Sequence, residues 1–198
     1  ARLGVKYVIK RDEVLVGFRE KASPFVADMS DCSVLDQRLA ALIAPLKLMI
    51  SSLTVKASIP QIEVAASEDM VVLVVRHLEA LLSEDVNILG QFSSKHGIRI
   101  MTQAAGPDSV IPLPGEAPAV LSYSLRGEGL VFEFEPLDFT QVNFSMNEQM
   151  TNQALDLLNL QADDQVIDAF CGIGNFTLPM AKRVTSVLGL ESAEASVQ

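Results

Sequence analysis

The chain has 198 residues, 49% of them apolar, and its positive mean hydropathy indicates a globular protein with a substantial core. Its net charge of -10 argues against a general polyanion-binding surface, because nonspecific affinity for nucleic acids comes largely from Lys and Arg. The apolar runs are far shorter than the roughly 20 residues that span a bilayer, and no secretion signal opens the sequence, so we expect a cytoplasmic protein.

The first segment is expected to form a β-hairpin, because residues 3–9 and 14–18 alternate apolar and polar side chains around a polar turn. Residues 1–21 carry six basic side chains against three acids, a local charge of +3. This excess indicates either an ordinary solvated hairpin or the one plausible RNA-facing patch of the chain.

A helix is expected next, from Leu35 to about Ile50, because apolar side chains recur there at helical spacing. Asp31 or Ser33 is the expected cap. Pro45 is expected either to break this helix or to begin its second half.

A second hairpin is expected over residues 59–66 and 70–76, and its later strand is apolar on both faces, which predicts a central position in a sheet. Ser83 is expected to cap a helix that runs to about Lys95 and ends at Gly97. Together these elements favour an α+β unit.

Three elements are expected after this helix. Residues 98–103 indicate a strand, and residues 104–118 indicate a loop without regular structure because they are rich in Pro and Gly. A third hairpin is expected over residues 120–125 and 130–135.

The pattern changes at residues 136–138 from hairpins to alternating helix and strand, which indicates a domain junction. We expect one domain over residues 1–138 and the start of another over residues 139–198. In the second, Ser145 and Glu148 have the spacing of a capping box and predict the start of a helix.

The most informative stretch is a glycine turn between a strand and a helix. Residues 165–170 indicate a short buried strand, and Gly172 and Gly174 allow the backbone to turn tightly beside a ligand. The helix expected over residues 175–183 would point its N-terminal amides at that ligand, and Pro179 fits only near its first turn.

A second apolar run, residues 185–190, ends at Glu191, where a carboxylate can accept hydrogen bonds from ribose hydroxyls. Its separation from the glycines is near the roughly 20 residues of dinucleotide sites. The strand, the glycines, the helix and the acid together favour a site for a nucleotide-type cofactor, with a plain strand-to-helix turn as the alternative.

The sulfur and imidazole side chains predict no site of their own. Cys32 and Cys171 lie far apart in the sequence, and we expect no disulfide between them. His77 and His96 are too few for a metal site, and no Ser-His-Asp or His-Glu-x-x-His arrangement occurs.

Two motifs closely resemble those of the S-adenosylmethionine-dependent RNA uracil-C5 methyltransferases. They are Phe-Thr-Gln-Val-Asn at residues 139–143 and Asp-Ala-Phe-Cys-Gly-Ile-Gly-Asn-Phe-Thr-Leu-Pro at residues 168–179. Ala-Arg-Leu at residues 1–3, Val-Gly-Phe-Arg-Glu-Lys at residues 16–21 and Cys32 are similar to the bacterial 23S ribosomal RNA branch of that family. The resemblance covers essentially the whole chain.

The resemblance implies an α/β enzyme with three parts. These are an N-terminal RNA-binding barrel, a central α+β domain that holds a 4Fe-4S cluster, and a C-terminal Rossmann-like domain that binds S-adenosylmethionine. This chain would hold the central part and the first part of the last domain.

The resemblance also implies which residues contact the cofactor. Glu191 would hold the ribose, and Gln141 would lie near the methionine end or the target base. The full set of implied contacts is Gln141, Phe170, Gly172, Gly174, Asn175 and Glu191.

Cys32 corresponds to the last of four thiolate ligands of the family's cluster, and the other three are expected before residue 1. We expect no cluster on this chain alone, where Cys32 would be an unused ligand or an ordinary thiol. Asp168 is expected either to support the glycine turn or to bond local amides at its strand end.

The implied reaction is attack of a cysteine thiolate on uracil C6, methyl transfer to C5 and proton removal by a general base. The nucleophile and the base are expected beyond residue 198, and Cys171 does not stand at the nucleophile's position, so we expect this chain to be inactive by itself. Two alternatives stay open, a transfer RNA uracil-C5 enzyme and a noncatalytic RNA- or protein-binding module.

Overall fold

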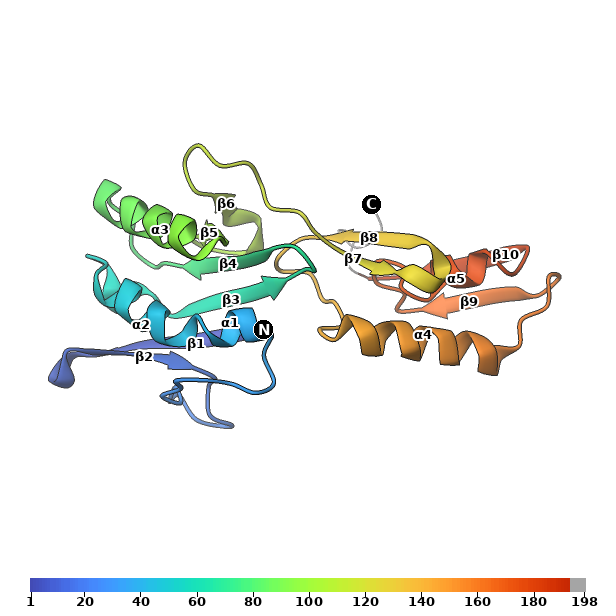
Figure 1. Ribbon diagram of the computed structural model, residues 1–198, viewed down its shortest axis with the longest axis horizontal. Helices are drawn as coiled ribbons and strands as arrows, with labels where there is room; N and C mark the ends of the chain where they lie inside the picture. The colour runs from blue at the N-terminus through green and yellow to red at the C-terminus, as the bar shows by residue number, and fades with distance from the viewer. Residues whose placement is uncertain (193–198) are drawn as a thin grey trace. The chain divides into compact units, whose positions relative to one another are not determined.

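The computed structural model describes residues 1–192, and its contacts divide the chain into two compact units (Figure 1). The first unit is Ala1–Ala119 and the second begins at Val120. Within the described residues, no helix has the length and apolar character needed to cross a membrane.

The first unit is built on one six-stranded sheet with the strand order β2-β1-β3-β4-β5-β6. All neighbouring strands are antiparallel except β4 and β5, which are parallel. Both hairpins predicted in this region are confirmed. The strands are β1 (Arg2–Val8), β2 (Glu13–Gly17), β3 (Gln61–Ala66), β4 (Val71–Arg76), β5 (Arg99–Gln103) and β6 (Val110–Pro112).

The helices α1 (Gln37–Ala40), α2 (Ile43–Ser51) and α3 (Ser83–His96) complete this unit, and α3 connects the parallel strands. Leu46 of α2 and Leu89 of α3 are fully buried and share one core cluster with Leu73 of β4. Five of the six β4 residues are buried, which confirms the central position predicted for that strand.

The helix starts in the first unit differ from the sequence expectation. Asp36 caps α1 by accepting a 2.8 Å hydrogen bond from the Arg38 amide, so the prediction of Asp31 or Ser33 was wrong. Asp31 instead accepts the amide of Cys32 at 2.7 Å. The helix divides in two, because Pro45 lies in the first turn of α2, where its missing N–H costs no intrahelical bond.

The prediction that Ser83 caps α3 was wrong, because Ser83 is already the first residue of the helix. Asp85 does the capping instead: its buried carboxylate accepts the Leu82 amide at 2.9 Å and both the amide and the hydroxyl of Thr54 at 2.7 Å. Gly97 ends the helix in a left-handed conformation with φ of 62°, as predicted.

The segment over residues 104–118 is not entirely a loop, contrary to the sequence expectation. Its residues 110–112 form β6, which pairs antiparallel with β5. Pro112 is tolerated there because β6 lies at the edge of the sheet, where one side of the strand has no partner to bond.

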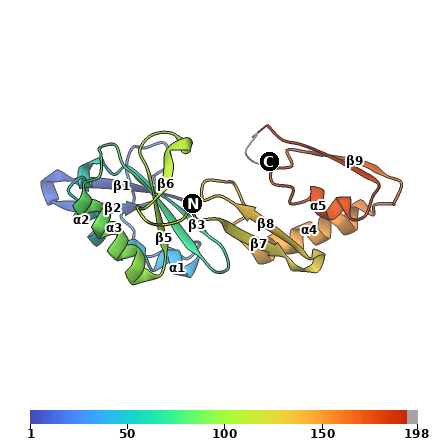
Figure 2. The same ribbon diagram turned by 90° about the horizontal axis from the view of Figure 1, so that it is seen from above.

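The second unit contains an antiparallel hairpin, a long helix and a parallel strand-helix-strand segment. The hairpin packs beside the helix α4 (Figure 2). The mixed α/β class predicted from the sequence is confirmed by the two units together. The elements are β7 (Leu121–Leu125), β8 (Leu130–Phe134), α4 (Phe144–Leu158), β9 (Gln165–Ala169), α5 (Thr177–Ala181) and β10 (Ser186–Leu190).

Asn143 caps α4, and its side-chain oxygen accepts the Met146 amide at 3.0 Å. The capping role expected for Ser145 was wrong, because Ser145 lies inside the first turn. The contacts group the β7–β8 hairpin with α4, where Tyr123 stacks on Phe144 with ring centroids 5.4 Å apart. The boundary between the two units therefore lies before this hairpin, whereas the sequence pattern indicates a domain junction after it.

Candidate cofactor site

The glycine turn lies between β9 and α5, and its backbone conformation favours glycine at two positions. Gly172 has φ of 53° and Gly174 has φ of 90°, both in the region that L side chains avoid. A Cβ at Gly174 would lie 3.3 Å from the Leu178 Cγ atom. A Cβ at Gly172 would have no described heavy atom within 4 Å, apart from atoms of the glycine itself and of its two chain neighbours. As far as residues 1–192 are concerned, the Gly172 side of the turn is therefore open.

Glu191 lies beside this turn, because the parallel pairing of β9 and β10 places the ends of the two strands together. Its Oε2 atom accepts the Gly172 amide at 3.0 Å, and its Oε1 atom accepts the Ser192 amide at 2.7 Å. The glycine turn and the second acid, which the sequence assigns to one cofactor site, therefore lie beside each other.

Phe170 is the residue at which the chain leaves β9, and its backbone is strained. It has φ of 64°, which is unusual for a residue with a Cβ, and the residue is 86% exposed. Its amide and that of Cys171 both donate to the Leu190 carbonyl, at 2.7 and 3.1 Å. Strain of this kind persists where surrounding bonds hold the backbone, and it is common at ligand sites.

Asp168 supports the start of α5. Its Oδ2 atom accepts the hydroxyl of Thr177, the first residue of that helix, at 2.5 Å. Of the two roles left open for Asp168, this contact favours support of the turn over bonding of local amides.

Asn175 and Gln141 occupy very different surroundings. The Asn175 side chain bonds only to protein groups, through Tyr123, Asn147 and Thr151. Gln141 is exposed in the segment between β8 and α4, and no hydrogen bond found among the described residues joins it to the turn.

An ion pair just after the end of α5 was not predicted from the sequence. Glu128, which is 8% exposed, accepts two hydrogen bonds from the Arg183 guanidinium at 2.6 and 2.9 Å. These bonds hold the pKa of Glu128 below its usual value and outweigh the opposite effect of burial. This ion pair ties the β7–β8 turn to the residues just after α5, and no local motif could have predicted a pair separated by 55 residues.

The cysteines are both free thiols of intermediate burial. The Cys171 sulfur packs against β10, where a Cβ at Gly189 would approach it to 2.9 Å. Within residues 1–192, no three side chains of His, Cys, Asp or Glu group as metal ligands, so Cys32 has no co-ligands there. The described residues therefore do not fit a 4Fe-4S cluster by themselves.

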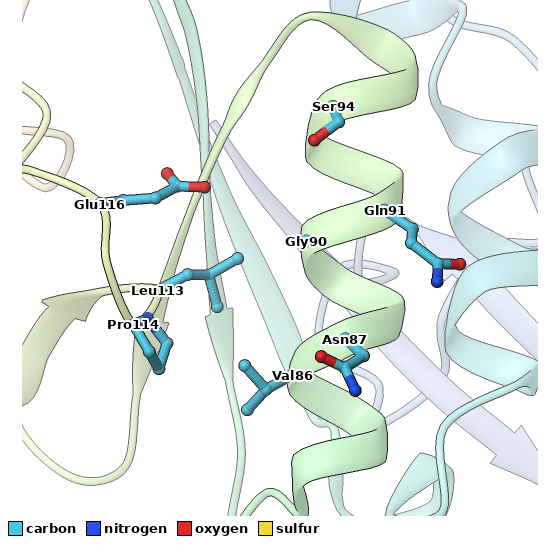
Figure 3. A pocket seen from close by; sticks show the side chains of 8 residues that line it. All are labelled: Val86, Asn87, Gly90, Gln91, Ser94, Leu113, Pro114 and Glu116. Atoms are coloured by element: carbon cyan, nitrogen blue, oxygen red, sulfur yellow. The ribbon is translucent and has the colours of Figure 1, made fainter.

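A hollow with a volume of about 520 Å³ lies in the first unit between α3 and the segment after β6 (Figure 3). Val86, Gly90 and Gln91 of α3 line one side, and Leu113 and Glu116 line the other. None of the residues implied to bind the cofactor lies in this hollow, and it contains neither a cysteine nor a histidine. The glycine turn is therefore the better candidate site.

Comparison with known proteins decides the family. The model of the tRNA (uracil-5-)-methyltransferase family matches residues 21–198. The chain belongs to this family. The resemblance seen in the two sequence motifs is thereby confirmed.

Relatives described as 23S rRNA (uracil(1939)-C(5))-methyltransferase match nearly all of the chain. The protein from Hahella chejuensis is 48% identical over 100% of this chain and 45% of its own length. The protein from Bordetella pertussis is 44% identical over 98% of this chain and 42% of its own length. The chain thus spans less than half the length of these relatives.

A solved structure supports the fold class of this family member. The Pyrococcus abyssi tRNA (uracil-54, C5)-methyltransferase, determined in complex with S-adenosyl-L-homocysteine, matches all of the chain and 49% of its own chain with a TM-score of 0.71. The sequences are 17% identical, so this likeness concerns the fold alone.

Proposed function

We propose that the whole protein transfers a methyl group from S-adenosylmethionine to C5 of a uracil in 23S ribosomal RNA. The observation that carries this proposal is the 44–48% identity, along almost the whole chain, to relatives described as enzymes of that activity. Such an enzyme would work where ribosomes are assembled, in the cytoplasm. This chain contributes part of the cofactor site and is inactive by itself.

In this proposal the glycine turn binds the cofactor on its open side. The Glu191 carboxylate, already beside the Gly172 amide, accepts the ribose hydroxyls. The exposed Phe170 ring covers an apolar face of the cofactor, and Gln141 reaches its methionine end or the target base. S-adenosylmethionine supplies an electrophilic methyl group, and these residues hold it in place.

The rest of the catalytic machinery comes from the remainder of the protein. The thiolate that attacks uracil C6 and the base that removes the C5 proton are assigned to no residue of this chain. Three apolar residues on one face of the β9–β10 sheet, Ile167, Leu188 and Leu190, are 50–67% exposed. Their exposure supports the idea that another part of the whole protein covers this face of the sheet.

The test uses the whole protein, produced at the length of its relatives, with S-adenosylmethionine labelled in the methyl group. The proposal predicts label at C5 of a single uridine of 23S ribosomal RNA, and strong loss of transfer in Glu191→Gln. Label only in transfer RNA would favour the second candidate, a transfer RNA enzyme, which the description of the family model allows. Label at another atom, or none, would favour a binding module instead.

We further propose that Cys32 ligates a 4Fe-4S cluster together with cysteines outside the described residues. Its free, partly accessible thiol is compatible with that role. Iron and sulfide analysis of the whole protein, purified without oxygen, should give four of each per chain. Cys32→Ser should lower both contents, and unchanged contents would assign Cys32 to the ordinary thiols.

A further inference from the structure

The Asn175 side chain has no hydrogen-bonding capacity left for a ligand. Its Oδ1 atom accepts bonds from the Tyr123 hydroxyl at 2.9 Å and from the Asn147 Nδ2 atom at 2.8 Å. Its Nδ2 atom donates to the Asn147 Oδ1 atom at 3.0 Å and to the Thr151 hydroxyl at 3.3 Å. A primary amide offers two donors and two acceptor lone pairs, so all four are engaged.

The three partners of Asn175 are buried and come from two other elements. Tyr123 lies on β7 and is 4% exposed, whereas Asn147 and Thr151 lie one turn apart on α4 and are 2% and 0% exposed. Asn147, Thr151 and Leu155 occupy the buried stripe of α4, where an amphipathic helix normally places apolar side chains. Two polar residues in this stripe are costly unless each finds its partner.

The tyrosine in this network is held rigidly and stays protonated. Its ring stacks on Phe132 and on Phe144, with centroids 5.0 and 5.4 Å away. Burial raises the pKa of Tyr123 to about 12, so its hydroxyl donates to Asn175 throughout the physiological pH range.

The glycine turn is therefore held at both ends. Gly172 at its start is bonded to Glu191, and Asn175 at its end is bonded to α4 and β7. The turn from Gly172 to Asn175 includes two glycines with positive φ, which would otherwise leave it with many accessible conformations. Ordering these residues before a ligand arrives removes an entropic cost from binding.

We propose that Tyr123, Asn147 and Thr151 are positioning residues that act through Asn175 to hold the glycine turn in its cofactor-binding conformation. Asn175 then serves the cofactor through its backbone position, and its amide side chain touches protein alone. This inference rests on the proposed function, and it adds three residues to the site that lie outside both sequence motifs.

The experiment compares Thr151→Val, which removes one hydrogen-bonding hydroxyl at nearly constant volume, with Thr151→Ser, which keeps it. Tyr123→Phe is the second variant, because it preserves the aromatic stacking if the valine variant fails to fold. Gln153→Ala, at an exposed position of α4, is the matched control. All are made in the whole protein.

Two measurements are made on each variant. Amide hydrogen exchange over residues 171–176, without cofactor, reports the order of the turn, and calorimetry reports the dissociation constant for S-adenosylhomocysteine. We expect Thr151→Val and Tyr123→Phe to speed exchange and to raise the dissociation constant about three- to tenfold, as loss of one neutral hydrogen bond allows. Thr151→Ser and Gln153→Ala should match the unmodified protein in both.

The outcomes separate this inference from the proposed function. Unchanged exchange in Thr151→Val and Tyr123→Phe overturns the inference, and so does faster exchange with an unchanged dissociation constant. If the unmodified protein does not bind S-adenosylhomocysteine, the proposed function fails, and the exchange measurement still decides whether the network orders the turn.

Discussion

Alanine substitutions at the two glycines of the turn should rank in one order by their effect on stability and in the reverse order by their effect on cofactor binding. Both positions have positive φ, which costs an alanine about 1 kcal/mol, partly offset because alanine also restricts the unfolded chain. At Gly172 nothing among the described side chains opposes the new methyl group, so the net loss of stability should be below about 1 kcal/mol.

At Gly174 two effects add to the same backbone cost. Its φ of 90° lies beyond the left-handed well, and the new Cβ would stand 3.3 Å from Leu178, which belongs to the short helix α5. We expect Gly174→Ala to lose about 2 kcal/mol in free energy of unfolding. The two losses differ by about 1 kcal/mol, so the two variants should differ in melting temperature by about 3 °C.

Among folded molecules, cofactor affinity should be lowered more by Gly172→Ala than by Gly174→Ala. The methyl group in Gly172→Ala occupies the open side that we assign to the cofactor, so its dissociation constant for S-adenosylhomocysteine should rise at least about tenfold, or 1.4 kcal/mol. Calorimetry on the folded whole protein, with thermal unfolding in parallel, measures both quantities. Undiminished binding by Gly172→Ala would refute the assignment of the open side to the ligand.

Three further predictions concern single side chains. Phe170→Gly should raise the free energy of unfolding by about 1 kcal/mol, because glycine adopts φ of 64° without strain, and it should weaken S-adenosylhomocysteine binding. A loss of stability in thermal unfolding would show that the Phe170 backbone is not strained. Asp85→Ala should cost about 3 kcal/mol in chemical denaturation, because three part-buried donors lose their common acceptor, and it should leave cofactor affinity unchanged. Asp31→Ala, at an exposed position, should cost much less stability. Glu128→Gln should destabilise the protein at pH values above 4.5, the ordinary glutamate pKa, and by progressively less as the pH falls, because the carboxyl has a lower pKa in the folded protein. Thermal unfolding at several pH values tests this prediction, and a pH-independent difference in stability would contradict it.

Most of the strands could be predicted because their signals are local. Alternation of apolar and polar residues marks the hairpins, and β4 is apolar on both faces because it is central. The helix caps could not be chosen from the sequence, since several Asp, Ser and Asn residues lie within a few positions of each start. Only the folded backbone shows that Asp36, Asp85 and Asn143 do the capping.

The site was predictable where its parts are close in sequence or joined by parallel strands. The glycines follow β9 directly, and parallel pairing of β9 with β10 brings Glu191 to them. The Asn175 network was not predictable, because the partners of Asn175 are 24 to 52 residues away from it in sequence and meet it only through packing of the hairpin on α4. No pattern distinguishes a buried Asn147 from an exposed one in the sequence.

The most direct test of the account is a crystal structure of the whole protein with S-adenosylhomocysteine. We expect the ribose hydroxyls within hydrogen-bonding distance of the Glu191 carboxylate, the ligand against the open side of Gly172, and the Asn175 amide still bonded to Asn147 and Thr151. A ligand bound away from the turn between β9 and α5, or one that displaces those bonds to reach the Asn175 side chain, would contradict it.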